Sequence, residues 1–169
     1  ADLKNQAAKN EKSFTKDDKQ IKAQDFAKRA YEKRLNGYKA TSLAYYDEAI
    51  ILDPSKAEYY YERALAKDQD LGDYDGAMAD YISAMELDSQ NADFYTENAS
   101  KAISTKILRQ EEAQKYADMF DFNISEGKYE EALENMNKAI ELDSYNSNYY
   151  YLRGNLEFNL EDFKIILHY

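Results

Sequence analysis

The amino-acid sequence predicts an all-α protein, and three observations point to this class. The chain has 169 residues but only one proline and five glycines, so residues that end helices or form tight turns are rare. Apolar and polar residues seldom alternate at period two, the pattern that half-buried strands require. Similar sequence blocks recur along the chain, which indicates an array of repeats. With 44% hydrophobic residues, the chain can bury a sizeable core.

The charge of the chain argues against a nucleic-acid partner. The net charge is −11, whereas phosphate binding depends on clustered Lys and Arg. Residues 1–40 carry eleven Lys and Arg against six Asp and Glu, and residues 41–169 carry eleven against twenty-seven. We therefore predict a polar, basic leader over residues 1–20, partly helical or disordered, before a repeat array over 21–169. Two interpretations of the leader stay open: a solvated segment, or an arm against the acidic body of the same or a neighbouring molecule.

Signals for compartment and membrane are sparse. The sequence has no cysteine, so it can form neither a disulfide framework nor a thiolate site. No apolar run approaches the ~18 residues that a membrane span needs, and no secretory hydrophobic segment is present. We expect a soluble protein without a membrane span. It is either cytoplasmic or exported with a leader already removed, since the chain begins at Ala1 rather than Met.

The residues that catalysis requires are not assembled in this sequence. His168 is the only histidine, which argues against a Ser-His-Asp triad or a two-His metal site. The glycines are isolated from one another, so no phosphate-binding loop is expected. Asp70, Asp73 and Asp75 surround Gly72 without the spacing of a calcium loop, and we interpret them as part of a turn between helices. We expect no enzymatic activity, no cofactor and no metal.

One sequence pattern occurs three times. The copies cover residues 57–91, 127–163 and, more weakly, 37–64. Two blocks that align are Asp-Tyr-Asp-Gly-Ala-Met at 73–78 and Lys-Tyr-Glu-Glu-Ala-Leu at 128–133. Three further blocks that align are Ala-Ile-Ile-Leu-Asp at 49–53, Ala-Met-Glu-Leu-Asp at 84–88 and Ala-Ile-Glu-Leu-Asp at 139–143.

These positions resemble the tetratricopeptide repeat (TPR) family, whose unit is a pair of helices of about 34 residues. In the first helix, the large aromatic and the small residue four positions later are Phe26 and Ala30, Tyr60 and Ala64, Tyr95 and Ala99, and Tyr150 and Gly154. The turn glycines are Gly37, Gly72 and Gly127, and the aromatics beyond the turns are Tyr74, Tyr129 and Phe163. The second helix matches at Ala77, Ala132, Tyr46, Tyr81, Met136, Ala49, Ala84 and Ala139. Small residues let paired helices approach and rings fill the remaining space, so we expect both kinds to be buried.

The resemblance implies a right-handed superhelical solenoid of about three to four helix-turn-helix repeats. The expected units are 23–56, 57–91, 113–146 and a truncated 147–169, with an extra helical insertion near 92–112. Two alternatives stay open for the insertion: an extra helix with a break near Ser104–Lys106, or one long helix. On one long helix, a single face would carry Tyr95, Ala99, Ala102, Ala113, Ala117, Phe120 and Ile124.

Local signals predict several helix ends. Capping-box spacing predicts helix starts at Thr15 with Asp18 and at Ser55 with Glu58. One extra residue lies between Ala64 and Gly72, compared with the regular spacing of the family. The chain ends shortly after the second helix of the last unit is expected to begin, which leaves residues 165–167 without a capping helix. Either the parent protein continues with further repeats, or this end pairs with a second chain.

In the TPR family, ligands bind the concave face, which the first helices line. Carried over to this chain, the inward-facing positions are Ala27, Tyr31, Arg34, Tyr61, Leu65, Asp68, Thr96, Ser100, Ile103, Tyr151, Asn155 and Phe158. We expect the partner contacts at Tyr31, Arg34, Tyr61, Leu65, Asp68, Tyr151, Asn155 and Phe158. In the Tyr triplets 59–61 and 149–151, successive side chains point about 100° apart, so one Tyr of each must face outward.

The resemblance implies a protein–protein interaction scaffold that binds a protein or peptide segment on its concave face. Ala27, Tyr31 and Glu62 stand where the family's carboxylate-binding subclass has Lys, Asn and Asn. A neutral or basic partner is therefore expected, rather than an acidic tail. The alternative is a structural protein that assembles into a homo-oligomer through its N-terminal arm or its open C-terminal end.

Overall fold

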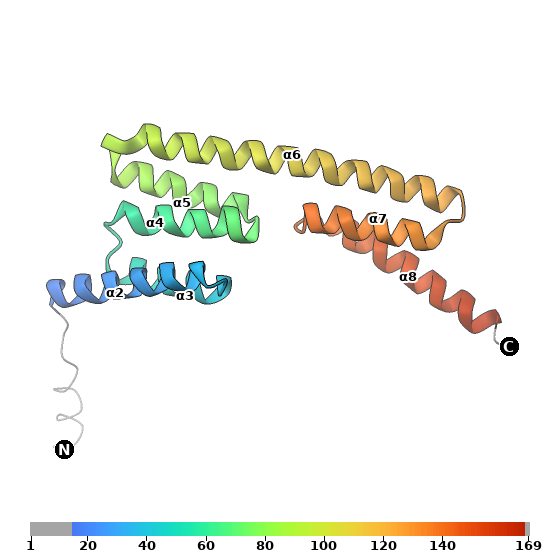
Figure 1. The fold of residues 1–169 in the computed structure, drawn as a ribbon, viewed down its shortest axis with the longest axis horizontal. Coiled ribbons are helices and arrows are strands. Elements are labelled where there is room, and N and C mark those ends of the chain that lie inside the picture. The colour runs from blue at the N-terminus through green and yellow to red at the C-terminus, as the bar shows by residue number, and fades with distance from the viewer. Residues whose placement is uncertain (1–14, 168–169) are drawn as a thin grey trace, which may run out of the picture. The chain divides into compact units, whose positions relative to one another are not determined.

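Residues 15–167 form an all-α structure in this computed structural model, which describes the side chains of residues 15–160 (Figure 1). The elements are α2 (Lys16–Leu35), α3 (Lys39–Leu52), α4 (Ala57–Leu65), η1 (Ala66–Leu71), α5 (Tyr74–Leu87), η2 (Ser89–Asn91), α6 (Ala92–Ser125), α7 (Tyr129–Leu142) and α8 (Ser147–Leu167). No strand occurs within residues 15–167, and the predicted all-α class of helical repeats is confirmed. Residues 1–14 of the predicted leader, and His168, lie outside the described residues.

The chain forms two compact units, and the boundary in sequence lies between Ile103 and Ser104. In the first unit, α2 pairs with α3, and α4 pairs with α5. The alanines predicted at the helix contacts, Ala30 and Ala64, are fully buried. The second-helix residues predicted to be buried with them are buried too: Tyr46, Ala49, Ala77, Tyr81 and Ala84. The small side chains therefore allow close helix pairing, as expected.

The first unit also shows how its helices begin. Thr15 forms the predicted capping box: its hydroxyl accepts the Asp18 backbone N–H at 3.1 Å, and the Asp18 carboxylate accepts the Thr15 N–H at 3.0 Å. The capping box predicted at Ser55 is wrong. Its hydroxyl instead donates to Asp53 at 2.6 Å, and α4 begins at Ala57 without a side-chain cap. The Asp53 carboxylate is only two residues from Ser55, so the hydroxyl bonds to this carboxylate instead of to the backbone at the start of the helix.

The extra residue before Gly72 is accommodated by a π-helical turn. Element η1, Ala66–Leu71, follows α4 directly and ends at Gly72 with φ +69°. A π turn holds one more residue than the α turn it replaces, so the helix reaches its glycine without a break. Gly37 and Gly127 also have positive φ, at 78° and 72°, so all three predicted turn glycines end helices in the left-handed conformation.

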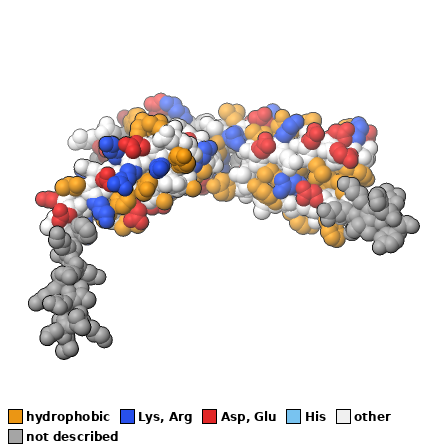
Figure 2. Space-filling view, turned by 60° about the horizontal axis from the view of Figure 1, so that its bottom comes forward, with side chains coloured by type: hydrophobic (Ala, Val, Ile, Leu, Met, Phe, Trp, Pro, Cys, Tyr) orange, Lys and Arg blue, Asp and Glu red, His pale blue; other side chains and the backbone are white. Residues whose placement is uncertain are grey.

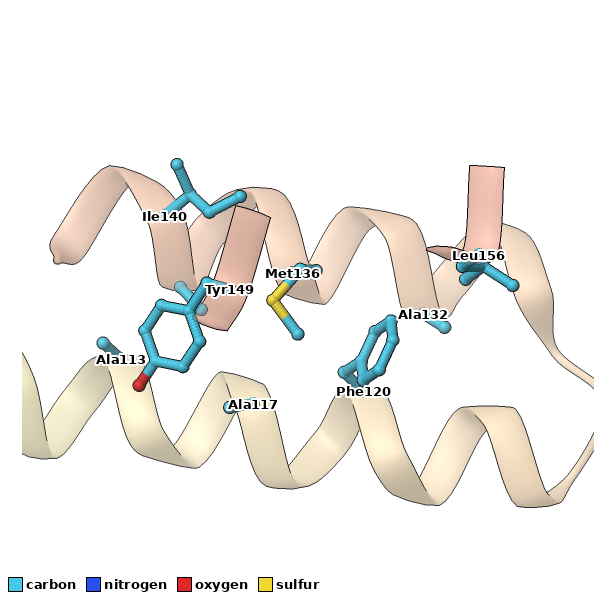
Figure 3. Close-up of a cluster of buried hydrophobic side chains, with 9 residues drawn as sticks. Ala113, Ala117, Phe120, Ala132, Met136, Ile140, Tyr149 and Leu156 are labelled. Atoms are coloured by element: carbon cyan, nitrogen blue, oxygen red, sulfur yellow. The ribbon is translucent and has the colours of Figure 1, made fainter. Parts of the chain in front are cut away.

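The second unit contains the later part of α6 together with α7 and α8. Its core joins Ala113, Ala117 and Phe120 of α6 to Met136 of α7 and to Tyr149 of α8 (Figure 3). The other buried members are Ala132, Ala139, Ile140 and Leu156. Each helix thus contributes one apolar face to the cluster, which is the arrangement that amphipathic helices produce.

The insertion is helical, and of the two alternatives the structure has the long helix. Element α6 runs without a break for 34 residues, and its predicted apolar face is buried from Tyr95 to Phe120, with Ile124 half-buried. Between Ala102 and Ala113, polar residues interrupt this face, and Arg109 is one of them. Its guanidinium donates to the backbone oxygens of Glu141 at 2.8 Å and Leu142 at 3.2 Å. These carbonyls end α7, so the interruption supplies a cationic cap for a neighbouring helix.

In both Tyr triplets, the buried ring is one residue earlier in the sequence than predicted. Tyr59 and Tyr149 are buried, each 4% exposed, whereas Tyr60 is half-buried and Tyr150 is 42% exposed. The ring of Tyr59 packs with Ala23 and Ala49, so it contacts the preceding helix pair. The rings that follow the turn glycines are also less buried than predicted: Tyr74 is half-buried, and Tyr129 is 39% exposed.

The end of the array also departs from the expectation. The turn predicted before Phe163 does not form, because α8 continues to Leu167 as one helix. Within residues 15–167, no second helix of that unit covers Gly154, which is exposed and would have no neighbour within 4 Å of an added Cβ. The prediction that Gly154 is a buried small residue is wrong for this reason. Of residues 161–167 only the backbone is described, which includes the predicted open end at 165–167.

The two kinds of glycine lead to opposite expected effects on stability. Gly72→Ala should lower the free energy of unfolding by about 1 kcal/mol, because alanine is strained at positive φ. Gly154→Ala should raise it by about 1 kcal/mol, because alanine is the better helix former at this exposed helical site. Urea unfolding followed by circular dichroism measures both. A loss of stability in Gly154→Ala would show that its side is covered in solution.

Candidate functional site

A pocket of about 610 Å³ lies in the first unit, between the first helices α2 and α4. Its lining residues are Gln24, Ala27, Lys28 and Tyr31 of α2, Tyr46 of α3, and Lys56, Glu58, Tyr59 and Glu62 at and within α4. Tyr31 is 47% exposed at this pocket, and Ala27 is half-buried. The two residues are about one helical turn apart on α2, so a small side chain lies next to an aromatic ring. The pocket has the size of a small-ligand or side-chain site.

Two residues in the lining of this pocket carry fully buried polar atoms. They are the hydroxyl oxygen of Tyr46, a residue only 1% exposed, and Oε2 of Glu62. Burial raises the pKa of Tyr46 well above its usual range, and the nearby Glu62 carboxylate adds to the rise. Burial also raises the pKa of Glu62, against the opposing effect of Arg34. The Tyr46 hydroxyl and the Arg34 guanidinium both act on the Glu62 carboxylate, so these buried groups belong to the internal contacts of the first unit.

Charges around the pocket are balanced. Its lining contains two cations, Lys28 and Lys56, and two carboxylates, Glu58 and Glu62. Arg34 adds a cation 3.7 Å from the Glu62 carboxylate, too far for a hydrogen bond. On the face of the molecule in Figure 2, acidic and basic side chains are likewise interspersed with hydrophobic ones. The pocket therefore has no single sign of charge with which to select a strongly charged ligand.

Of the five predicted contact residues in the first unit, only Tyr31 lines the pocket. The Arg34 side chain is 15% exposed and binds Asp70 at 2.8 Å and Gln69 at 3.0 Å, so it links α2 to η1. Asp68 accepts a hydrogen bond from the Tyr81 hydroxyl at 3.4 Å. These polar residues stabilise the unit internally.

The two remaining residues of this set, Tyr61 and Leu65, contribute to packing. The Tyr61 ring lies 5.1 Å from Phe94, 5.6 Å from Tyr95 and 6.1 Å from Tyr81, measured between ring centroids. Both Tyr61 and Leu65 are half-buried against the cluster that contains Ala64 and Tyr81. Replacing Tyr61 by Ala would thus disturb the contact of α4 with α6 as well as any bound partner.

The three predicted contact residues of the second unit lie on α8 and are exposed. Tyr151 is 66% exposed, Phe158 is 65% exposed, and Asn155 is also exposed. Their spacing of four and then three residues places them on one face of the helix. On α6, the other carried-over positions Thr96, Ser100 and Ile103 are exposed as well. The assignment of all these residues to partner binding stays a prediction.

Sequence reasoning did not include Tyr46 in the site. Its position in the repeat predicted a buried ring in the second helix, and the ring is buried. The hydroxyl at the end of that ring was not considered, although the equivalent Tyr81 hydroxyl finds a carboxylate and Met136 has none. Comparing the polar tips at this repeat position would have identified Tyr46 as a candidate.

Within residues 15–160, no three His, Cys, Asp or Glu side chains are grouped in a way that could hold a metal ion. Asp73 instead caps α5 by accepting the Gly76 N–H at 3.0 Å, as the turn interpretation predicted. No helix in the described part of the chain is both long enough and apolar enough to span a membrane.

Comparisons with known proteins give a family match over part of the chain and several structural similarities. Residues 124–160 match the family model described as TPR repeat. Three solved structures are similar: the Arabidopsis OM64 TPR domain (19% identity, TM-score 0.42, 83% of this chain and 98% of that one), MamA 41-end from Desulfovibrio magneticus RS-1 (18%, 0.46, 87% and 90%), and the Yersinia enterocolitica type III secretion translocator chaperone SycD (15%, 0.43, 86% and 86%). No curated protein sequence matches the chain significantly.

Proposed function

We propose that this chain, which is a tetratricopeptide repeat protein, is a protein–protein interaction scaffold that holds an extended segment of its partner in the pocket between α2 and α4. The observation that carries the proposal is the pocket itself, whose lining combines the exposed aromatic ring of Tyr31 with polar side chains such as Gln24 and Glu58. Such a combination provides both directional and apolar contacts for a ligand.

The lining of the pocket supports a neutral or basic segment over an acidic one. Lys28 and Lys56 offset Glu58 and Glu62 in the lining, so the expectation rests on the positions that bind carboxylates in the carboxylate-binding subclass. Ala27 and Tyr31 offer no positive charge at the positions that hold Lys and Asn in the carboxylate-binding subclass. Tyr31 instead presents a rigid ring, which contributes contact area at a low cost in conformational entropy.

The exposed face of α8 provides a second set of contacts in this proposal. Tyr151, Asn155 and Phe158 belong to the other compact unit, so their contribution is tested separately from that of the pocket. Two large exposed rings on one helical face are a typical feature of a recognition surface.

The test begins with selection of random twelve-residue peptides displayed on phage against the full 169-residue chain. Selected peptides are then titrated by fluorescence anisotropy. Ala27→Arg, which places a long side chain in the pocket, should weaken binding by at least about tenfold, because a filled pocket excludes the ligand. Ala44→Arg is the matched control, since Ala44 is exposed on α3 and does not line the pocket.

Equal binding of all selected peptides to Ala27→Arg and to the control would contradict the pocket assignment. In that case Tyr151→Ala with Phe158→Ala shows whether the α8 face is the binding surface instead. Sedimentation velocity of the unliganded chain tests the alternative of self-assembly, since a stable homo-oligomer would favour the structural role.

A further inference from the structure

One side of α8 repeats the local structure of α4, but within residues 15–167 it lacks the second helix that covers α4. This side contains Tyr150, Arg153, Gly154 and Glu157. We infer that it docks one helix of the partner protein, which packs there as the second helix of a repeat does. The inference rests on the proposed function, because the helix belongs to the partner that the scaffold binds.

The equivalent residues of the two helices have the same arrangement. In α4, the Arg63 guanidinium lies 5.7 Å from the centre of the Tyr60 ring. In α8, the Arg153 guanidinium lies 5.6 Å from the centre of the Tyr150 ring. The repeat pattern in the sequence thus extends to the placement of the side chains.

Both arginines also bind the second helix that precedes them. Nη1 of Arg63 donates to Asp47 of α3 at 2.6 Å, and Nη1 of Arg153 donates to Asn137 of α7 at 2.9 Å. On the side that faces the preceding repeat, α8 is therefore packed in the same way as α4. The two helices differ on the side that faces their own second helix.

In the first unit, that side is covered by a closely packed helix. Ala64 of α4 is fully buried in one cluster with Ala77 and Tyr81 of α5. At the equivalent position of α2, the carbonyl oxygen of Ala30 accepts a hydrogen bond from the Ser42 hydroxyl of α3 at 2.9 Å. A small residue at this position allows a second helix to approach closely.

On α8 the equivalent position is bare. Gly154 is exposed, and an added Cβ would meet no neighbour within 4 Å. The Tyr150 ring is 42% exposed, whereas the equivalent Tyr60 is half-buried. Glycine stabilises an exposed helix less than alanine does, but it leaves room for a closely packed neighbour.

The helices that cover this position elsewhere share one pattern. A small residue is followed by a large one four positions later and by a second small one three positions after that. These spacings place all three on one face of a helix. The buried residues of the pattern are Ser42, Tyr46 and Ala49 in α3, Ala77, Tyr81 and Ala84 in α5, and Ala132, Met136 and Ala139 in α7. The helix expected on α8 has the same pattern.

The charges of α8 select among such helices. Asp80 of α5 binds the arginine of α4 at 2.6 Å and Lys67 at 2.8 Å. In α8 the position of Lys67 holds Glu157, whose side chain is 54% exposed and lies 3.6 Å from Arg153. A carboxylate is thus already beside Arg153, and Glu157 would repel a second one. The docked helix is therefore expected to carry a neutral residue at the position of Asp80, as α7 does with Asn135.

The test uses a peptide with the sequence of residues 127–146, which contains α7, closed into a helix by a lactam between Glu134 and Lys138. Both side chains are exposed in α7, so the link leaves the apolar face unchanged and fixes the helix before binding. The peptide is titrated into the full 169-residue chain labelled with 15N. We expect changes in amide chemical shift centred on Gly154. Absence of such changes from α8 would overturn the inference.

Two substitutions at Gly154 form a matched pair. Gly154→Ala introduces the residue that α2 and α4 have at this position, so it should keep the affinity for the peptide within about twofold. Gly154→Gln also favours a helix but fills the space, so it should weaken binding at least about tenfold. Circular dichroism checks that both variants remain helical. Binding by the Gln variant that equals binding by the Ala variant would contradict docking at this side.

A charge exchange tests the choice of a neutral helix. The peptide with Asn135→Asp should bind the wild-type chain about threefold more weakly, because Glu157 repels the new carboxylate. Against the variant Glu157→Lys, which recreates the pairing of Lys67 with Asp80, the order of the two peptides should reverse. The inference fails if the order is the same for both proteins.

The outcomes are separate from those of the pocket. Ala27 lies in the first unit, so Ala27→Arg should leave the affinity for the helical peptide unchanged. If Ala27→Arg weakens binding of this peptide as Gly154→Gln does, the peptide occupies the pocket and the inference about α8 is overturned. If the phage-selected peptides ignore Ala27→Arg while the helical peptide binds α8, the pocket assignment fails and this inference is supported.

Discussion

Replacing Asp80 by Ala is expected to lower the free energy of unfolding of the first unit by about 3 to 5 kcal/mol, the usual cost of removing one partner from a buried ion pair. The Asp80 side chain is 5% exposed on α5. It binds two nitrogens of Arg63, at 2.8 and 2.6 Å, and the ammonium of Lys67 at 2.8 Å. Without Asp80, two partly buried cations would lack their common carboxylate.

Asp47 provides a matched control for this prediction. It binds the same Arg63 at 2.6 Å, but its side chain is 55% exposed on α3. Because solvent screens exposed pairs, Asp47→Ala should cost less than about 1 kcal/mol. Urea unfolding followed by circular dichroism compares the two variants. Equal costs would show that burial does not determine the strength of this network, which joins α3, α4, η1 and α5.

Tyr149→Ala is expected to destabilise the second unit by about 3 kcal/mol, as large-to-small changes of buried aromatics do. The Tyr149 ring is 4% exposed and packs into the cluster with Ala113 and Phe120 (Figure 3). Two residues further on, Tyr151 is 66% exposed, so Tyr151→Ala should change stability by less than about 0.5 kcal/mol. Thermal and urea unfolding measure the difference.

The first unit repeats this experiment at an equivalent position. Tyr59→Ala should be more destabilising than Tyr60→Ala, because Tyr59 is 4% exposed while Tyr60 is half-buried beneath the Arg63 guanidinium, 5.7 Å from its ring. The sequence pattern predicted Tyr60 and Tyr150 to be the buried rings of their triplets. If Tyr60→Ala and Tyr150→Ala prove the costlier changes, the helical register seen in the structure is wrong at these sites.

The candidate site was only partly predictable. The resemblance placed Ala27 and Tyr31 on the binding face, and both line the pocket. It also named Arg34 and Tyr61, which the structure instead engages in an ion pair with Asp70 and in a ring cluster with Phe94. Whether a side chain at a lining position is free depends on residues far away in sequence, and a repeat pattern does not specify those neighbours.

Sequence periodicity was sufficient to locate the helix pairs, the three turn glycines and the buried face of α6. Ala30, Ala64 and Ala99 are buried as expected because each faces a neighbouring helix at a fixed offset along the chain. The π turn of η1 likewise accommodates the one residue by which the spacing from Ala64 to Gly72 exceeds that of the family. These features arise from contacts within one repeat or between adjacent repeats, so a repeating pattern contains the information for them.

Long-range packing determined the rest. Tyr59 and Tyr149 are the buried members of their triplets because each contacts helices that precede its own. Gly154 is exposed because α8 continues through Leu167 without a turn, so no helix among residues 15–167 covers it. The burial of the Tyr46 hydroxyl depends on α2, α3 and α4 meeting around one pocket. Burial is a property of the surroundings of a residue, and one helix defines only part of them.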